Sequence, residues 1–197
     1  MRQGSFTKER IFQAALNIFA ENGYEGARID KIASEVGINK ASLYFHFKSK
    51  EELFTQLFHN IISKYRDKMK MIVTDDRDLP IKDHLKSIYT EYLDYNWGNA
   101  EMEFWNRIYY LPPPFLRDEI ISITSDTKKE FVADLAKIMD KGILRKELRE
   151  LDANHMANTF YYVLTCIDLS ADLMKKEDAI RDMEYCFEVI WTGIKGS

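Results

Sequence analysis

Lysine, serine, histidine and aromatic side chains lie close together in residues 39–50, NKASLYFHFKSK, and they are the side chains best suited to chemistry in this chain. The hydroxyl of Tyr44 and the ammonium group of Lys50 suit phosphate oxygens. Small, polar and aromatic side chains on a short helix suit base edges and thymine methyl groups in the major groove. The segment therefore predicts contact with double-stranded DNA, through Asn39, Lys40, Ala41, Ser42, Tyr44, Phe45, His46, Lys48 and Lys50. Arg28, which precedes the segment, is a further predicted DNA contact.

Two short helices must position these side chains. Apolar residues recur at helical spacing over 29–36 and predict a helix with one buried face. Gly37 suits a left-handed turn at its end, and Asn39 is a good N-cap for a second helix over 40–46. Leu43 anchors this second helix inward, so its other faces remain available to DNA. The pattern is that of a helix-turn-helix.

Packing inside the small domain is the alternative role for the aromatic residues of this segment. We expect that role for Phe47 but not for Tyr44 or Phe45, because Leu43 and Phe47 already occupy the inward positions. Ser49 is a good cap for a following helix, whose first amide groups offer another site for a phosphate.

The segment from about Thr7 to Leu53 resembles the N-terminal domain of the TetR family of bacterial transcriptional repressors. The matching stretches are RIFQAALNIFAENGYEGA and DKIASEVGINKASLYFHFKSKEELF, in the order and spacing of that family. The resemblance implies an all-helical homodimer whose larger domain binds a small molecule and so releases DNA. One position departs from the family: Arg28 stands where Thr or Ser is usual. Arginine cannot cap a helix as a hydroxyl does, although it can reach a phosphate directly.

The charge distribution fits a protein that places one end on DNA. The chain of 197 residues has a formal net charge of −4, but residues 1–70 carry 12 Lys/Arg and 8 Asp/Glu, whereas residues 71–197 carry 16 and 24. Chance asymmetry is the alternative explanation, which the helix-turn-helix makes a poor one. No apolar run is long enough to span a membrane, and the N-terminus MRQGSFTKER lacks the apolar core of a signal peptide. We therefore expect a cytoplasmic protein without a membrane partner.

The whole chain is expected to be all-α, with a helix-turn-helix DNA-binding domain over 1–50 and a ligand-binding and dimerisation domain over 51–197. A long helix from 50 to about 71 links the two domains, and the polar segment 73–80 is the best candidate for a break. Thr7 is the expected N-cap of the first helix and Gly142 the expected stop of a later one. The other helices are expected at about 8–22, 81–96, 100–110, 115–141, 153–174 and 176–194.

Aromatic residues are concentrated in residues 89–131 and again at 160–162. A cavity lined by such residues, with a few polar groups, is the usual form of a small-molecule site. Ordinary core packing is the alternative for each residue taken singly. Glu103 and Asp168 lie among apolar neighbours and could receive a cationic lipophilic ligand, or could be structural or solvated. The predicted ligand residues are Tyr89, Tyr92, Glu103, Phe104, Trp105, Tyr109, Phe131, Phe160 and Asp168.

The last two helices carry more apolar surface than one helical domain easily buries, which predicts a four-helix dimer interface. The residues expected there are Phe160, Leu164, Ile167, Met183, Phe187, Ile190 and Trp191. A dimer of this kind would read a roughly palindromic operator.

Other classes of function find less support. The four histidines show no metal-ligand spacing with one another or with Cys166 and Cys186, and we expect no metal or cofactor. The cysteines read as small buried hydrophobes, with redox sensing as the alternative. No nucleophile and base show a recognisable spacing, so we do not expect an enzyme. The main rival is a DNA-binding regulator controlled by a protein partner, and a constitutive architectural protein is a weaker one. The effector, the operator and the direction of control are not encoded in any recognisable motif.

Overall fold

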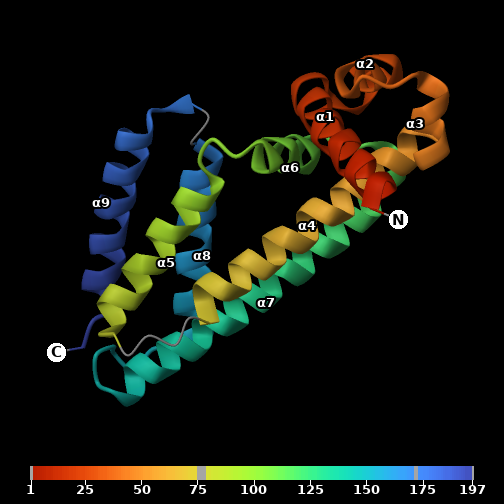
Figure 1. The fold of residues 1–197 in the computed structure, drawn as a ribbon. Helices are drawn as coiled ribbons and strands as arrows, with labels where there is room; N and C mark the ends of the chain where they lie inside the picture. The colour runs from red at the N-terminus through yellow and green to blue at the C-terminus, as the bar shows by residue number, and fades with distance from the viewer. Residues whose placement is uncertain (1, 75–78, 171–172, 197) are drawn as a thin grey trace. The chain divides into compact units, whose positions relative to one another are not determined.

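The computed structural model describes residues 2–74, 79–170 and 173–196, with the side chains of residues 2–6 and 168 left out of the description. Within these ranges every regular element is helical, apart from one isolated antiparallel bridge between Leu148 and Lys195. The prediction of an all-α chain is confirmed. The elements, labelled in Figure 1, are α1 (Arg2–Gly26), α2 (Ile29–Val36), α3 (Lys40–His46), α4 (Lys50–Thr74), α5 (Ile81–Asn96), α6 (Ala100–Tyr110), the 3₁₀ turn η1 (Pro114–Leu116), α7 (Arg117–Leu144), α8 (Ala153–Ser170) and α9 (Lys176–Ile194).

The chain forms two compact units. Unit 1 consists of Met1–Tyr65 and Gly98–Ile121, and unit 2 of Arg66–Trp97 and Ser122–Ser197. Helices α4 and α7 therefore each contribute to both units. The expected division of functions at residue 50 stays a prediction, and residues 75–78 of the expected break at 73–80 lie outside the described residues.

The helix-turn-helix of unit 1 is formed as the sequence predicts. The apolar face of α2 is buried, and Leu43 of α3 is completely inaccessible to solvent. Gly37 ends α2 with φ of 75°, in the left-handed region that glycine enters without steric cost. Its amide donates to the Ser34 carbonyl, and the Ile38 amide donates to the Ala33 carbonyl over 2.9 Å, so the chain turns without leaving these groups unpaired.

The end of α1 is shaped by a second glycine. Gly23 has φ of 69° and ψ of −179°, a conformation open essentially only to glycine, and it breaks the regular helix within α1. Arg107 of α6 covers this break by donating from Nη1 to the carbonyls of Ala20 and Glu21, at 2.7 and 2.9 Å. A Cβ on Gly23 would lie 3.2 Å from Arg107 Nε, so the glycine also makes room for this contact.

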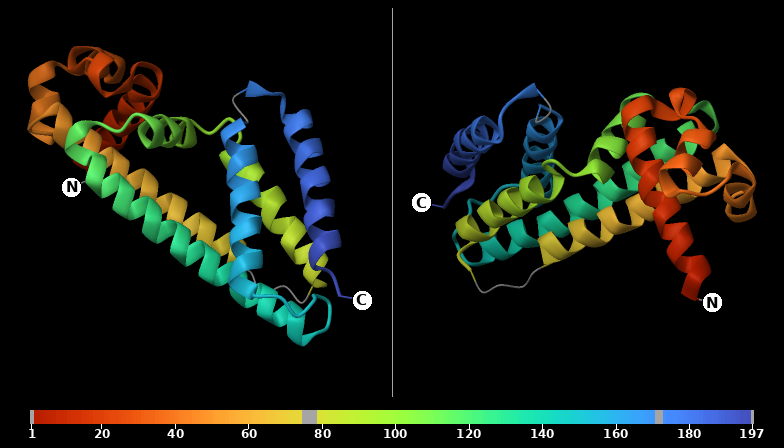
Figure 2. Two further views of the ribbon diagram at one scale, coloured as in Figure 1. Left: turned by 180° about the vertical axis from the view of Figure 1, so that it is seen from behind. Right: turned by 45° about the horizontal axis from the view of Figure 1, so that its top comes forward.

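The core of unit 2 is made by α5, α8 and α9, which lie side by side in Figure 2. Tyr89 of α5 stacks on Phe160 of α8 with ring centroids 4.1 Å apart, and the edge of one ring meets the face of the other between Tyr89 and Phe187 of α9. The Tyr89 hydroxyl donates to the Phe160 carbonyl over 3.2 Å, which satisfies its polar end inside the core. Burial raises the pKa of this hydroxyl well above its ordinary value.

Two expectations about helix ends are wrong. Thr7 lies inside α1 and does not cap it, because the helix begins at Arg2. Gly142 lies inside α7, where a Cβ would come within 2.7 Å of the Leu148 side chain. This glycine therefore permits close packing of the following segment, and the left-handed residue after the helix is Lys146, with φ of 60°.

Candidate nucleic-acid interface and ligand site

The second helix of the helix-turn-helix, α3, presents most of the predicted DNA-contacting side chains to solvent. Its inward side is held by Leu43, and Phe47 just beyond it is also fully buried. By contrast Phe45 is 87% exposed. This exposure leaves the Phe45 ring available for the predicted contact with a base edge or a thymine methyl group. Lys40, Ala41, Ser42 and Tyr44 share this exposed surface, and His46 is half-buried at its end.

Asn39 has a structural role as well as a predicted DNA contact. Its side-chain oxygen accepts a hydrogen bond from the Ser42 amide over 2.8 Å, which caps α3 as expected. The helix has only seven residues, so its first turn depends on this cap. The Lys40 ammonium group lies 5.9 Å from the centre of the Tyr44 ring, on the same exposed surface.

The start of α4 is organised by a second cap. The Ser49 hydroxyl accepts a hydrogen bond from the Glu52 amide over 3.0 Å, as expected, and the Glu52 carboxylate accepts one from the Lys48 amide over 2.7 Å. This arrangement fixes the backbone between Phe47 and α4 and leaves the Lys48 side chain exposed.

Lys50 is held against the end of α1. Its ammonium group lies 4.5 Å from the centre of the Tyr24 ring and donates to the Glu25 carbonyl over 3.3 Å. Burial, with the nearby charges of Glu51 and Glu25, raises the pKa of Tyr24, so the hydroxyl stays protonated. The Tyr24 ring and the Glu25 carbonyl thus position the Lys50 ammonium group at the start of α4. A bound phosphate would contact the same ammonium group.

Arg28 occupies the N-cap position of α2 without capping it, as its residue type predicts. Its guanidinium forms an exposed ion pair with Asp30, with Nη2 and Oδ2 2.8 Å apart. The hydrogen bond raises the pKa of Arg28 and lowers that of Asp30. A phosphate would therefore compete with the Asp30 carboxylate for this arginine.

The predicted ligand residues are divided between the two units. In unit 2, Tyr89, Tyr92, Phe131 and Phe160 are buried, and the stacked Tyr89–Phe160 pair is part of the core. In unit 1, Phe104 is buried and Trp105 half-buried, whereas Glu103 and Tyr109 are exposed. The exposure of Glu103 matches the solvated alternative and not a charge buried for a ligand. The side chain of Asp168 lies outside the described part of the structure.

Two side chains of unit 2 contain buried polar atoms that the aromatic pattern did not reveal. Within the described residues, the amide nitrogen and oxygen of Asn96 in α5 and the hydroxyl of Thr127 in α7 are buried without a hydrogen-bond partner. Such an atom costs about 1–3 kcal/mol unless water or a ligand pairs with it. A lone Asn near the end of a helix gives no signal of this kind in sequence.

The expected dimer residues need correction. Four of the seven are buried within this single chain: Phe160, Leu164, Met183 and Phe187. They form the contacts among α5, α8 and α9, and a partner chain cannot reach them. Ile167, Ile190 and Trp191 are half-buried. The apolar side chains that α8, α9 and the segment between them expose are instead Tyr162, Leu169, Leu173, Ile180, Tyr185 and Val189.

Several structural contacts were not predicted because they join distant parts of the chain. Arg10 of α1 donates from Nη2 to the Val36 carbonyl at the end of α2 over 2.7 Å, and Arg107 covers the end of α1.

Cys166 is exposed, contrary to the expectation of burial, and Cys186 is half-buried; neither forms a disulfide. Among the described residues no cluster of histidine, cysteine and carboxylate side chains could hold a metal ion, and no helix could cross a membrane.

The N-terminal domain is similar in sequence to known regulatory proteins. Residues 11–57 match the family model described as bacterial regulatory proteins, tetR family. The biofilm operon icaADBC HTH-type negative transcriptional regulator IcaR of Staphylococcus epidermidis is 38% identical over 60 residues, which are 30% of this chain and 32% of that protein. The chain spans about a quarter to a third of the length of the curated relatives it matches.

Solved structures share the fold over the whole chain. A TetR transcriptional regulator from Chloroflexus aurantiacus has a TM-score of 0.75 at 21% identity and covers 100% of both chains. A regulator from Saccharomonospora viridis, solved in complex with choline, has a TM-score of 0.77 at 20% identity, covering 98% of this chain and 100% of that one. At these identities the likeness establishes the fold.

Proposed function

We propose that this chain, whose N-terminal domain belongs to the tetR family of bacterial regulatory proteins, is a ligand-responsive transcriptional repressor that binds a palindromic operator as a dimer. The observation that carries the proposal is the outer face of α3. There the chain exposes Phe45 beside Lys40 and Ser42, while Leu43 and Phe47 complete the core beneath. A repressor role draws on the resemblance to IcaR, which is a negative regulator.

The DNA-binding domain makes two kinds of contact, one with phosphates and one with bases. Tyr44, Lys48 and Lys50 meet phosphates, which position the domain without reading sequence. Lys40, Ser42 and Phe45 meet base edges or thymine methyl groups in the major groove. The side-chain oxygen of Asn39 already accepts the hydrogen bond that caps α3. Asn39 therefore contacts DNA through its side-chain amide nitrogen, or supports DNA binding only by stabilising α3.

Dimerisation uses the outward face of α8 and α9, in place of the buried residues first expected. Tyr185 and Val189 are large apolar side chains with little cover from their own chain, and Leu169 of α8 is partly exposed. Two copies paired about a two-fold axis would bury them, and would present two α3 helices to successive major grooves.

The effector enters unit 2 and pairs with Asn96. The buried amide lacks a partner among the described residues, so a ligand that brings a hydrogen-bonding group can satisfy it. The expectation of a lipophilic or aromatic effector comes from the aromatic content of the sequence, since Tyr89 and Phe160 themselves stack in the core. The Saccharomonospora viridis structure holds choline, so a ligand with a quaternary ammonium group is one class to test. Coupling to DNA passes along α4, which is covalently continuous from unit 2 to the helix-turn-helix, and needs to be worth only about 1–3 kcal/mol.

A selection from random duplex DNA tests the DNA side of the proposal. The wild-type protein should enrich a palindromic motif whose half-site centres are about one helical turn or a multiple apart. Phe45→Ala should lose enrichment at the half-site bases while still binding DNA through phosphates. Enrichment of no motif, or of the same motif by both proteins, would contradict the assignment of α3 as the reading helix.

The variant Asn96→Leu tests the effector side. Removing an unpaired buried amide should raise the melting temperature of the free protein, because the penalty of about 1–3 kcal/mol disappears. The same variant should lose the thermal shift given by choline, benzyltrimethylammonium or an aromatic compound that stabilises the wild type. A lower melting temperature, or an unchanged ligand shift, would show that Asn96 does not receive the effector.

A further inference from the structure

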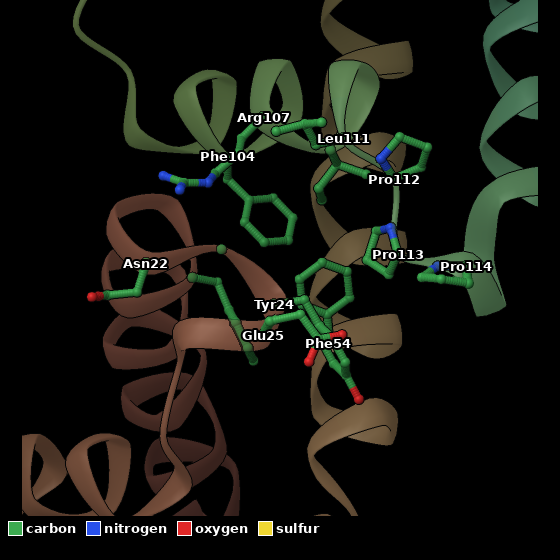
Figure 3. Close-up of a pocket in the computed structure, with 13 residues that line it drawn as sticks. Asn22, Tyr24, Glu25, Phe54, Phe104, Arg107, Leu111, Pro112, Pro113 and Pro114 are labelled. Carbon is green, nitrogen blue, oxygen red and sulfur yellow. The ribbon is translucent and has the colours of Figure 1, made fainter.

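A pocket lies in unit 1, and none of its lining residues belongs to unit 2. It has a volume of about 230 Å³ and lies between the end of α1, α4, α6 and the proline segment 112–114. Figure 3 shows the Phe104 ring directed from α6 toward Tyr24 and Phe54, with the three prolines along one side. Of the residues predicted to bind a ligand, only Phe104 lines this pocket.

The walls of this pocket are rings and proline faces. The centroids of Phe54 and Phe104 are 5.2 Å apart, and those of Tyr24 and Phe54 are 5.1 Å apart with their planes steeply inclined. Such a lining favours a flat apolar molecule that can stack or meet an edge. An engineered apolar cavity of about 150 Å³ accommodates benzene, so a pocket of about 230 Å³ has room for a fused two-ring aromatic.

We propose that this pocket is a binding site for a neutral bicyclic aromatic molecule. Two polar residues of the lining are engaged elsewhere: Arg107 holds the carbonyls of α1, and the Asn22 amide nitrogen donates to the Ile18 carbonyl over 3.0 Å. The remaining charged residue of the lining, Glu25, disfavours an anionic ligand, and contact with the rings and prolines provides the affinity. The site is distinct from the effector site of unit 2.

Two residues of the pocket wall also position Lys50, which is a predicted DNA contact. Lys50 lies over the Tyr24 ring at 4.5 Å and donates to the Glu25 carbonyl, and both of these residues line the pocket. A ligand that turns Tyr24 or shifts Glu25 would move the Lys50 ammonium group at the start of α4. This coupling rests on the proposed function, whereas binding to the pocket does not.

Titration of 5-fluoroindole, followed by fluorine NMR without DNA, tests the site directly. Leu111 lines the pocket and is 77% exposed, so Leu111→Trp should obstruct it with little effect on folding. Leu144 in unit 2 is 84% exposed, and Leu144→Trp is the matched control. We expect saturable binding to the wild type and the control, and at least tenfold weaker binding to Leu111→Trp. No saturable binding to the wild type, or equal affinity in both variants, would overturn the proposal.

A second titration tests the route through Lys50. With a selected duplex, 5-fluoroindole should change the DNA affinity of the wild type, and Lys50→Ala should abolish that change beyond its own loss of affinity. The proposed coupling through Lys50 would be refuted if 5-fluoroindole still changed the DNA affinity of Lys50→Ala, or if it did not change the DNA affinity of the wild type. Failure to find any bound duplex would refute the proposed function and leave the DNA-free result to decide the pocket.

Discussion

Asn39 is the residue at which the fold and the proposed DNA contact can be separated most cleanly. Its side-chain oxygen caps α3 by accepting from the Ser42 amide over 2.8 Å. Asn39→Ala removes the cap at a cost of about 1 kcal/mol, and Asn39→Ser replaces it with a cap of similar strength. For a chain of this size, about 1 kcal/mol lowers the melting temperature by about 2–4 °C.

The same energy limits the effect on DNA. Because α3 has seven residues, loss of the cap frays the turn that carries Lys40 and Ser42. Re-ordering that turn on DNA costs at most the lost cap energy in each protomer, so the affinity of Asn39→Ala should fall by at most about fivefold for each α3 helix, or about thirtyfold for the dimer. Asn39→Ser should retain both the stability and the affinity of the wild type.

Thermal unfolding by circular dichroism and fluorescence anisotropy on one duplex measure both effects. The account of Asn39 as a cap is refuted if the Ala variant melts with the wild type, or if the Ser variant is as unstable as the Ala variant. Should the Ser variant keep its stability but lose as much affinity as the Ala variant, the amide itself contacts DNA.

Three further predictions follow from particular residues. Gly23→Ala should lower the melting temperature, because the backbone conformation of Gly23 costs a non-glycine residue about 1–3 kcal/mol. Gly193→Ala should raise the melting temperature, because Gly193 lies in the last turn of α9 with open space around it. The opposite order in thermal denaturation would contradict the backbone argument. Tyr44→Ala should weaken DNA binding with little change in its salt dependence, because a neutral hydroxyl releases no counterion, while sedimentation still reports a dimer; loss of the dimer would contradict the placement of Tyr44 in the DNA-binding surface. Val189→Glu, at a side chain 74% exposed on α9, should yield monomers by sedimentation, whereas Leu144→Glu, at a side chain 84% exposed in unit 2, should not. An intact Val189→Glu dimer would place the interface elsewhere.

The helix-turn-helix could be read from sequence because its signals are local. Gly37, Asn39 and Ser49 each act on the backbone within a few residues, and the structure places them at the predicted turn and caps. Arg107 shows the opposite case. Nothing near it in sequence indicates that it covers the end of α1, since that contact spans 87 residues.

Burial was the harder quantity to predict. The periodicity of α8 and α9 marks apolar faces but does not say whether the chain's own α5 or a second chain covers them. For Phe160, Met183 and Phe187 the answer is the chain's own core. Aromatic content was ambiguous in the same way, because Tyr89 and Phe160 fill space by stacking on one another. The pocket of unit 1 was not foreseen, because it forms where segments distant in sequence meet.

Competition between duplexes from around the protein's own coding region and random DNA, measured by fluorescence anisotropy over a series of salt concentrations, tests the central claim most directly. A sequence-specific regulator should bind a promoter duplex about 10³-fold or more tightly than random DNA, and the preference should persist as salt weakens both. A duplex recovered from random-sequence selection serves where the operator lies elsewhere. Equal, weak binding to the selected duplex and to random DNA would contradict the account.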